Sequence, residues 1–278
     1  MTHQQSTLSS NSGCRIYTQN WQPGDEPKAV LILVHGLAEH SNRYVGIANY
    51  FTEQGYAVYA LDHEGHGHSQ GLRGYINSFD DFLTTLDQYL NNIANQHPGK
   101  KLFLVGHSMG GVISSAYLLE HQQKLAGCIL SGAALATGDV ISPVQKVVLN
   151  TLSKVLPKLP VLQLEANDVC HDPAVVEAYK NDPHVFTGKI RVRLITEILR
   201  TADRVLKNAA NISLPMLILH GGDDKMASPS GSEKLYAGIS SSDKTLKIYP
   251  GLYHEIFLEP EKLEIYATIH TWLEQKLA

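Results

Sequence analysis

The sequence predicts an α/β protein with a mostly parallel sheet covered by helices, and two observations indicate it. Short runs rich in β-branched residues alternate with longer segments whose apolar residues recur at helical spacing. The composition, 43% hydrophobic and 18% charged over 278 residues, is that of a folded globular protein and disfavours a disordered chain. The length suits one core that carries an insertion.

Six apolar runs are short enough to be buried strands of one sheet. They are expected at residues 30–34, 57–61, 102–105, 127–130, 216–219 and 245–249, after a weaker first strand near 15–21. The first twelve residues are polar and lack the basic start and apolar stretch of a secretory signal. We interpret them as a short disordered tail.

Helices are expected between these strands, at residues 44–54, 79–93 and 112–120, with a closing amphipathic helix at 259–277. The alternation stops at residues 133–211, where strand patterns vanish and prolines separate helical pieces. We therefore predict a core formed by residues 1–132 and 212–278, with a helical cap at 133–211. An insertion between two strands lies above their carboxyl ends, where open α/β sheets bind ligands.

Charge, hydropathy and cysteine content exclude several classes of protein. The formal net charge of -4 comes without a long run of either sign, which disfavours a nucleic-acid partner. No apolar run approaches the roughly 18 residues that a membrane-spanning helix needs. The three cysteines, Cys14, Cys128 and Cys170, are widely spaced, as expected for free thiols in a reducing compartment. We expect a cytoplasmic protein without an obligate protein partner.

The strand at 102–105 runs into Gly106-His107-Ser108-Met109-Gly110 and then into a helix. Gly-x-Ser-x-Gly between a strand and a helix is the nucleophile elbow of the α/β-hydrolase fold. The turn is so tight that side chains at the two glycines would strike neighbouring backbone, while the serine is strained and its hydroxyl exposed. The pattern predicts Ser108 as a nucleophile.

A serine hydroxyl needs a base to take its proton and an acid to orient that base. In this fold the chain order is serine, acid, histidine. His254 is the only histidine in the loop after the last predicted strand, and Asp223 and Asp224 both follow the strand at 216–219. His254 is the expected base, and either aspartate can end the turn that supplies the acid.

The tetrahedral intermediate of ester hydrolysis needs two N–H donors for its oxyanion. The N–H of Met109, just after the nucleophile and at a helix N-terminus, is the first candidate. The second is the N–H of Leu37, in the His35-Gly36-Leu37 loop after the strand at 30–34.

Three segments make the resemblance to a known family specific. These are His35-Gly36-Leu37-Ala38-Glu39-His40-Ser41-Asn42-Arg43-Tyr44, the elbow with its extra Gly111, and Tyr179-Lys180-Asn181-Asp182-Pro183. Together they resemble the monoglyceride lipase and lysophospholipase group. The resemblance covers nearly the whole chain and implies an α/β-hydrolase that cleaves monoacylglycerols or similar single-chain esters without a cofactor or metal. It favours Ser108, Asp224 and His254 as the triad.

The resemblance also implies a glycerol-binding end of the pocket. In similar lipases, the positions that match Glu39, Arg43, His107 and Tyr179 lie there. Glu39 and Arg43 stand four apart and can instead be a surface ion pair of little energy. Some members of the group place a second histidine three residues after the catalytic one, where this chain has Phe257.

Other functions remain open at this point. Lysophospholipase and short-chain carboxylesterase activities use the same motifs, and a non-catalytic ligand-binding protein can be built on the same scaffold. The segment Asp62-His63-Glu64-Gly65-His66-Gly67-His68-Ser69 has the composition of a metal site, but it resembles the turn that supports the active-site floor in this group.

The predicted cap contains a broad apolar helical face with three lysines at its sides. Its apolar members are Val144, Val147, Val148, Val155, Leu152, Leu156 and Leu159 with Thr151, and its lysines are Lys146, Lys154 and Lys158. Such a face can lie in a membrane interface, which would make the protein peripheral to the membrane. Alternatively it packs onto the sheet domain and closes an acyl tunnel.

Overall fold

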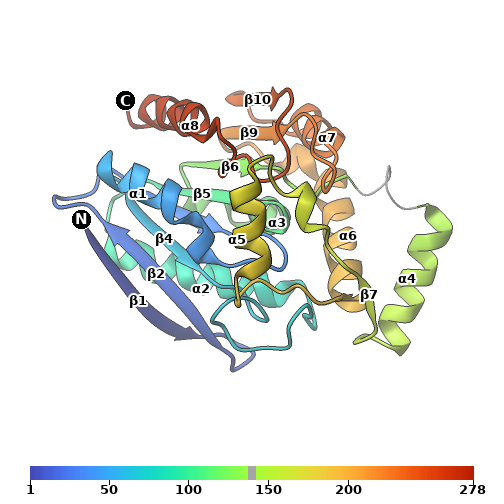
Figure 1. Cartoon of the computed structure of the whole chain (residues 1–278). Coiled ribbons are helices and arrows are strands. Elements are labelled where there is room, and N and C mark those ends of the chain that lie inside the picture. The colour runs from blue at the N-terminus through green and yellow to red at the C-terminus, as the bar shows by residue number, and fades with distance from the viewer. Residues whose placement is uncertain (137–141) are drawn as a thin grey trace.

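The computed structural model describes residues 1–136 and 142–278, and its centre is a sheet with helices on both faces (Figure 1). The strands are β1 (Thr2–Ser9), β2 (Arg15–Gln22), β3 (Val30–Val34), β4 (Ala57–Leu61), β5 (Leu102–His107), β6 (Gly127–Ser131), β7 (Pro160–Leu162), β8 (Ile190–Arg191), β9 (Met216–Gly221) and β10 (Lys244–Tyr249). The helices are α1 (Val45–Glu53), α2 (Asp80–Gln96), α3 (Met109–His121), α4 (Pro143–Val155), α5 (Pro173–Asn181), α6 (Val192–Lys207), α7 (Ser230–Gly238) and α8 (Lys262–Leu277).

Eight strands form one sheet in the order β1-β2-β4-β3-β5-β6-β9-β10. β1 pairs antiparallel with β2, and β2 pairs antiparallel with β4. The other neighbours in this order, from β4 through β3, β5, β6 and β9 to β10, pair in parallel. The α/β class and all seven predicted strands are confirmed, with ends that shift by at most two residues. Because β3, β5, β6, β9 and β10 are parallel, the loops after them meet at one edge of the sheet.

The alternation of side chains along β3 explains the two apolar layers. Val30, Ile32 and Val34 face the cluster that α2 and α3 cover, and Leu31 and Leu33 face the cluster that α1 and α8 cover. All five are buried. The sheet is thus packed on both faces, which is why its strands appear as continuous apolar runs in the sequence.

The prediction of a disordered amino-terminal tail is wrong for residues 2–9. They form β1, which pairs with β2 in register from Thr2 opposite Gln22 to Ser9 opposite Arg15. Backbone hydrogen bonds to β2 order this segment, and His3 stacks on Trp21 with ring centroids 5.0 Å apart. Seven of the eight β1 residues are exposed, so the strand lacks the apolar alternation by which strands are found.

The segment between β6 and β9 is mostly helical, as predicted, and residues 137–141 of the predicted cap lie outside the described residues. It also contains a two-stranded sheet, β7 paired with β8, that the proline-rich pattern did not indicate. α6 packs against α3, and its apolar side joins the larger core cluster. The division into a core and a cap at 133–211 stays a prediction.

α4 lies at the periphery of the molecule, beyond α6 and β7 (Figure 1). Its residues Val144, Val147 and Val155 are 73%, 65% and 70% exposed, and Val148, Leu156 and Leu159 are exposed too. The interpretation in which this face packs onto the sheet domain is therefore wrong. In the described part of the chain, no helix is both long and apolar enough to cross a membrane.

Candidate active site

Ser108 stands between β5 and α3, in the turn that the sequence predicts as an elbow. Its φ of 54° lies in the left-handed region, which residues with side chains rarely adopt. The neighbouring glycines allow this turn: a Cβ on Gly106 would lie 2.6 Å from the Gly110 carbonyl oxygen, and one on Gly110 would overlap the Val34 carbonyl. The tight packing that the motif requires is therefore present.

Asp224 and His254 are hydrogen-bonded partners in the loops after β9 and β10. His254 Nδ1 lies 2.7 Å from Asp224 Oδ2, and both side chains are buried. The other carboxylate oxygen accepts the N–H groups of Met226 and Ala227 at 2.8 and 2.9 Å. With Oδ1 held by the backbone, Oδ2 is aimed at the imidazole. The neighbouring Asp223 is exposed and makes no such contact among the described residues.

Burial and charge act in opposite directions on this pair. Burial favours neutral His254, but the Asp224 carboxylate, followed by Glu255 and Glu39, raises the pKa of the imidazole above its ordinary value. Burial alone would raise the pKa of Asp224, yet His254 and His220 hold it well below its usual range. Asp224 is therefore ionised at neutral pH and can stabilise a protonated His254.

Ser108 and His254 line the same cavity, whose volume is about 340 Å³. The segment between β6 and β9 contributes its apolar wall: Leu162, Leu164, Val169, Ile195, Ile198 and Leu199. The core contributes most of the polar groups, including Glu39, His107 and Glu255. A mostly apolar cavity with a few convergent polar groups is typical of a site for a lipid-like small molecule.

Leu37 and Met109 also line this cavity beside Ser108. Among the described residues, neither backbone N–H donates a hydrogen bond, whereas the N–H of Gly36 donates to Glu39 Oε1 at 2.6 Å. Met109 begins α3, so its N–H lies at the positive end of the helix dipole. Both predicted oxyanion donors are thus near the serine and available.

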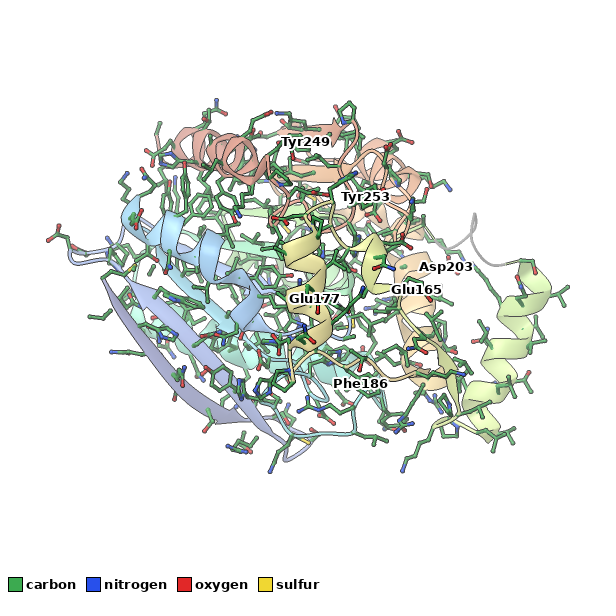
Figure 2. All side chains as sticks on the ribbon, viewed as in Figure 1. Glu165, Glu177, Phe186, Asp203, Tyr249 and Tyr253 are labelled. Carbon is green, nitrogen blue, oxygen red and sulfur yellow. The ribbon has the colours of Figure 1, made fainter. Side chains whose placement is uncertain are left out.

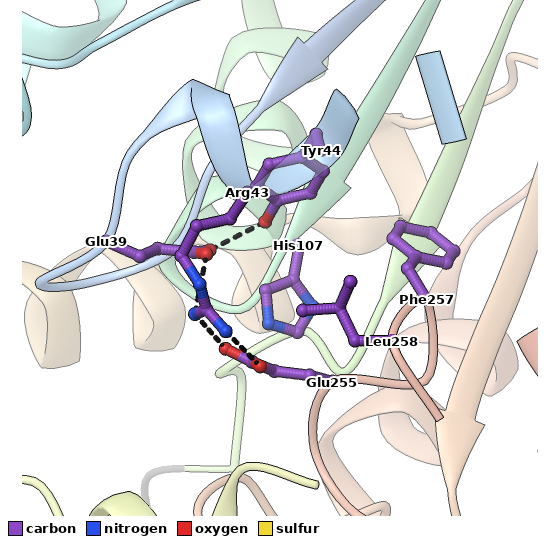
Figure 3. Close-up of a pocket in the computed structure, with 7 residues that line it drawn as sticks. All are labelled: Glu39, Arg43, Tyr44, His107, Glu255, Phe257 and Leu258. Atoms are coloured by element: carbon purple, nitrogen blue, oxygen red, sulfur yellow. Dashed lines mark hydrogen bonds and ion pairs between the residues drawn. The ribbon is translucent and has the colours of Figure 1, made fainter. Parts of the chain in front are cut away.

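Glu39 and Arg43 are not a surface pair, because their side chains are only 5% and 8% exposed. Arg43 binds Glu255 through both terminal nitrogens, at 2.5 and 2.6 Å, and lies 3.3 Å from Glu39 Oε2 (Figure 3). Tyr44 donates its hydroxyl to Glu39 Oε1 at 2.6 Å. The arginine thereby connects the loop after β3 with the residue next to His254.

The predicted head-group residues divide between two cavities. Glu39, His107 and Tyr179 line the large cavity with Ser108. Arg43 lines only a small neighbouring cavity, which Glu39 and His107 also border and which has room for about one water molecule. Arg43 lies under the Tyr179 ring, with its guanidinium carbon 4.6 Å from the ring centroid. It therefore supports Glu39 and Tyr179 from behind the cavity wall.

The Asp62–Ser69 segment forms a turn that holds the loop after β3. Asp62 Oδ1 accepts the N–H and the hydroxyl of Ser41 at 2.8 and 2.6 Å, and its Oδ2 accepts the N–H of His68 at 2.8 Å. The N–H of His63 donates to Nε2 of His35 at 2.8 Å. Two backbone N–H groups and the Ser41 hydroxyl thus occupy the carboxylate of Asp62, as expected for a structural turn.

Comparisons with known proteins agree with this geometry. A family model described as "Serine aminopeptidase, S33" matches residues 25–261. The chain is 37% identical to a monoacylglycerol lipase of Mycolicibacterium smegmatis over 99% of both proteins. It belongs to the monoglyceride lipase group of the α/β-hydrolases.

Two further members of this group agree with the assignment. The monoglyceride lipase of Homo sapiens is 31% identical over 98% of this chain and 90% of its own length. The crystal structure of a monoacylglycerol lipase from Paleococcus ferrophilus superposes with a TM-score of 0.85 and 31% identity, over 94% of this chain and 99% of that one. The chain is a carboxylic ester hydrolase.

Sequence reasoning missed two residues of this lipase fold that surround the candidate triad. Glu255 pairs with Arg43, and His220 Nε2 lies 3.1 Å from Asp224 Oδ2 while its Nδ1 lies 2.7 Å from the Ser232 hydroxyl. Each adjoins a predicted loop, but the chain has fourteen histidines and twenty-seven acidic residues, and no sequence pattern distinguishes these two from the others. The partner of Glu255 lies 212 residues away, whereas His220 contacts Asp224 four residues further along the chain.

Proposed function

We propose that this protein hydrolyses monoacylglycerols to free fatty acid and glycerol through an acyl-enzyme on Ser108. One observation carries the proposal. A single cavity contains the elbow serine, the histidine that is bonded to Asp224, two free N–H groups, an apolar wall and a polar wall. The apolar wall suits one acyl chain, and the polar wall suits a glycerol head group.

The chemistry follows from the position of each group. Ser108 Oγ attacks the ester carbonyl while His254 takes its proton, and the oxyanion that forms accepts hydrogen bonds from Leu37 and Met109. His254 then returns the proton to the departing glycerol oxygen. Water, activated by the same imidazole, cleaves the acyl-enzyme and releases the fatty acid. Asp224 stays ionised throughout and stabilises the imidazolium.

Glu39 and Tyr179 are our candidates for glycerol binding. Glu39 Oε1 already accepts two hydrogen bonds, whereas Oε2 faces only Arg43 at 3.3 Å and has capacity for a hydroxyl donor. The Tyr179 hydroxyl has no hydrogen-bond partner among the described residues and belongs to a residue that lines the cavity. His107 lies beside His254, with ring centroids 4.7 Å apart, and burial lowers the pKa of its imidazole, so it is neutral there.

Tyr179→Phe tests the head-group assignment. The variant should lose about tenfold in kcat/KM on a monoacylglycerol, the equivalent of one hydrogen bond, and little on the methyl ester of the same acid. Tyr236→Phe, on α7, is the control. Equal losses on both esters would show that Tyr179 supports the fold instead. A lysophospholipid and an aminoacyl anilide belong in the same panel, and faster turnover of either would contradict the proposed substrate.

We also propose that the exposed face of α4 contacts the membrane surface that contains the substrate. Val144, Val147, Val148 and Val155 form a contiguous apolar stripe on this helix, and large exposed apolar patches mark interaction sites. Leu162 and Leu164, which follow α4 along the chain, line the cavity, so a lipid that enters beside α4 is close to Ser108.

A Val148→Asp, Val155→Asp double variant tests this contact. Turnover of a water-soluble short ester should survive, whereas hydrolysis of monoacylglycerol in phosphatidylcholine vesicles should fall at least tenfold. Should both activities fall together, the stripe belongs to the fold and not to a membrane contact.

A further inference from the structure

A further cavity lies between α4 and α6, away from the catalytic one. Its volume is about 280 Å³, and it is lined by Asn150, Ser153 and Lys154 of α4 and by Arg193 and Arg200 of α6. None of these five residues lines the catalytic cavity. Three of the five carry a positive charge, and nothing in the proposed hydrolysis uses them.

The positive charge of this cavity is only partly compensated. Glu197 lies 3.0 Å from Arg200 and 3.9 Å from Arg193, and it also accepts the N–H of Phe79 at 3.1 Å. In the described part of the chain, Lys154 has no ion-pair partner, and the buried Nε of Arg193 has no hydrogen-bond partner. The two arginines thus share one carboxylate and Lys154 has none, which leaves two positive charges in excess.

A charged pair that joins the two helices does not change this balance. Asp203 of α6, labelled in Figure 2, binds Lys146 of α4 at 2.9 Å. Neither residue lines the cavity. The pair joins α4 to α6 and leaves the basic cavity with its excess charge.

The basic cavity borders the apolar stripe of α4. Lys154 follows Val147 by seven residues, so two turns of helix bring both to nearly the same side of α4. Val155, the next residue, is 70% exposed. A cationic cavity beside an exposed apolar helix face matches the two parts of an anionic phospholipid, whose phosphate is charged and whose chains are apolar.

We propose that this cavity binds the phosphate of an anionic phospholipid while the α4 stripe lies among the acyl chains. The inference rests on the proposed membrane contact of α4 and adds the lipid class that the contact selects. The guanidinium of Arg193 offers paired N–H donors that match phosphate oxygens, and Lys154 supplies a point charge. Asn150 supplies an uncharged amide donor. Bound lipid would hold α4 at the surface from which the substrate enters.

Vesicle binding tests the proposal. The whole chain is compared on vesicles of phosphatidylcholine alone and of phosphatidylcholine mixed with phosphatidylglycerol, at one salt concentration. The test variant is Lys154→Gln, Arg193→Gln, and the control is Lys207→Gln, Lys262→Gln, which removes the same charge elsewhere. Turnover of a water-soluble ester checks that each variant is folded.

Wild type should bind the mixed vesicles more tightly than the neutral ones. The affinity of the cavity variant for mixed vesicles should be roughly 25-fold lower than that of wild type, about fivefold for each cation removed. Its affinity for neutral vesicles should not change. The control should keep most of the preference. An equal loss in the control would overturn the proposal in favour of general electrostatic attraction. Binding of millimolar inorganic phosphate to the cavity by a wild type that shows no preference for mixed vesicles would also overturn it, because the cavity would then be a site for a free anion.

The two proposals fail differently. If wild type binds neither kind of vesicle, the membrane contact of α4 is wrong and this inference falls with it. If wild type binds both kinds equally, the α4 contact stands and only the phosphate site is wrong.

Discussion

Asp223 and Asp224 differ in what their side chains contact, although the sequence offers both as the acid. Asp224 is buried and hydrogen-bonded to His254, and Asp223 is exposed. Asp224→Asn should lower kcat by roughly 10⁴, because the imidazole loses the acceptor that orients it, while Asp223→Asn should change kcat by less than about threefold. Steady-state rates on a monoacylglycerol check this. The reverse ranking would move the acid by one residue.

The pH dependence of hydrolysis depends on the charge around His254. The base must be neutral to act, so kcat/KM falls as the pH drops through its pKa. Because Asp224, Glu255 and Glu39 raise that pKa, the midpoint should lie above the ordinary value of about 6.5. Glu255→Gln removes one of these charges and should lower the midpoint. A midpoint that stays in place would show that Glu255 does not act on the imidazole.

The buried ion pairs of Arg43 should contribute more to the free energy of unfolding than an exposed ion pair does. Arg43→Met would leave Glu39 and Glu255 buried without their cation and should lower the free energy of unfolding by about 3–5 kcal/mol. Lys28→Met, which removes a half-exposed partner of Glu274, is the control and should cost at most about 1 kcal/mol. Urea unfolding measures both. Similar losses would mean that the buried network contributes no more than a surface pair.

At the level of residues, the sequence predicts which side chains surround the cavity. It does not predict which partners those side chains contact. The elbow motif and the chain order suffice to select Ser108 and His254, because local backbone geometry sets their positions. The pairing of Arg43 with Glu255 joins positions 212 residues apart and carries no local signal. The spacing of Glu39 and Arg43 therefore allowed a surface pair, whereas tertiary packing buries both.

Among the elements, the turn between β5 and α3 is the least tolerant of change. A methyl group on Gly110 would overlap the Val34 carbonyl, whereas one on Gly24 would meet nothing within 4 Å. Gly110→Ala should lower the melting temperature by roughly 10 °C, equivalent to about 4 kcal/mol, and Gly24→Ala by less than about 2 °C. Thermal unfolding checks both. A stable Gly110→Ala would contradict the packing described for the elbow.

The strands that the sequence predicts are those whose burial requires a run of apolar residues. The strands from β3 to β10 in the large sheet lie between two apolar layers, and the sequence shows them as apolar runs. β1 is mostly exposed, and β7 and β8 are only three and two residues long, so none of them shows a run of alternating apolar residues, although Ile190 of β8 is buried in the core. Periodicity detects burial and not hydrogen bonding, which is why these strands were missed.

At the scale of the whole molecule, the segment between β6 and β9 is attached to the core around the catalytic cavity. The N–H of Phe186, a residue marked in Figure 2, donates to the Ala38 carbonyl at 2.8 Å. The buried Glu259 carboxylate, near His254, accepts the N–H of His171 at 3.1 Å and that of Tyr253 at 2.8 Å. The apolar side of α6 packs into the core, whereas the apolar stripe of α4 stays exposed. Both helices are amphipathic in sequence, but only α6 forms part of the cavity wall, and the apolar side of α4 is surface.

Replacement of Ser108 tests the central claim most directly. Hydrolysis of a long-chain monoacylglycerol by Ser108→Ala, with thermal unfolding as the check on folding, should fall by on the order of 10⁶ in kcat, because the variant lacks the hydroxyl that forms the acyl-enzyme. The variant should also fail to react with a serine-directed phosphonate that labels the wild type. A folded Ser108→Ala protein that keeps even a tenth of the wild-type rate would contradict the mechanism.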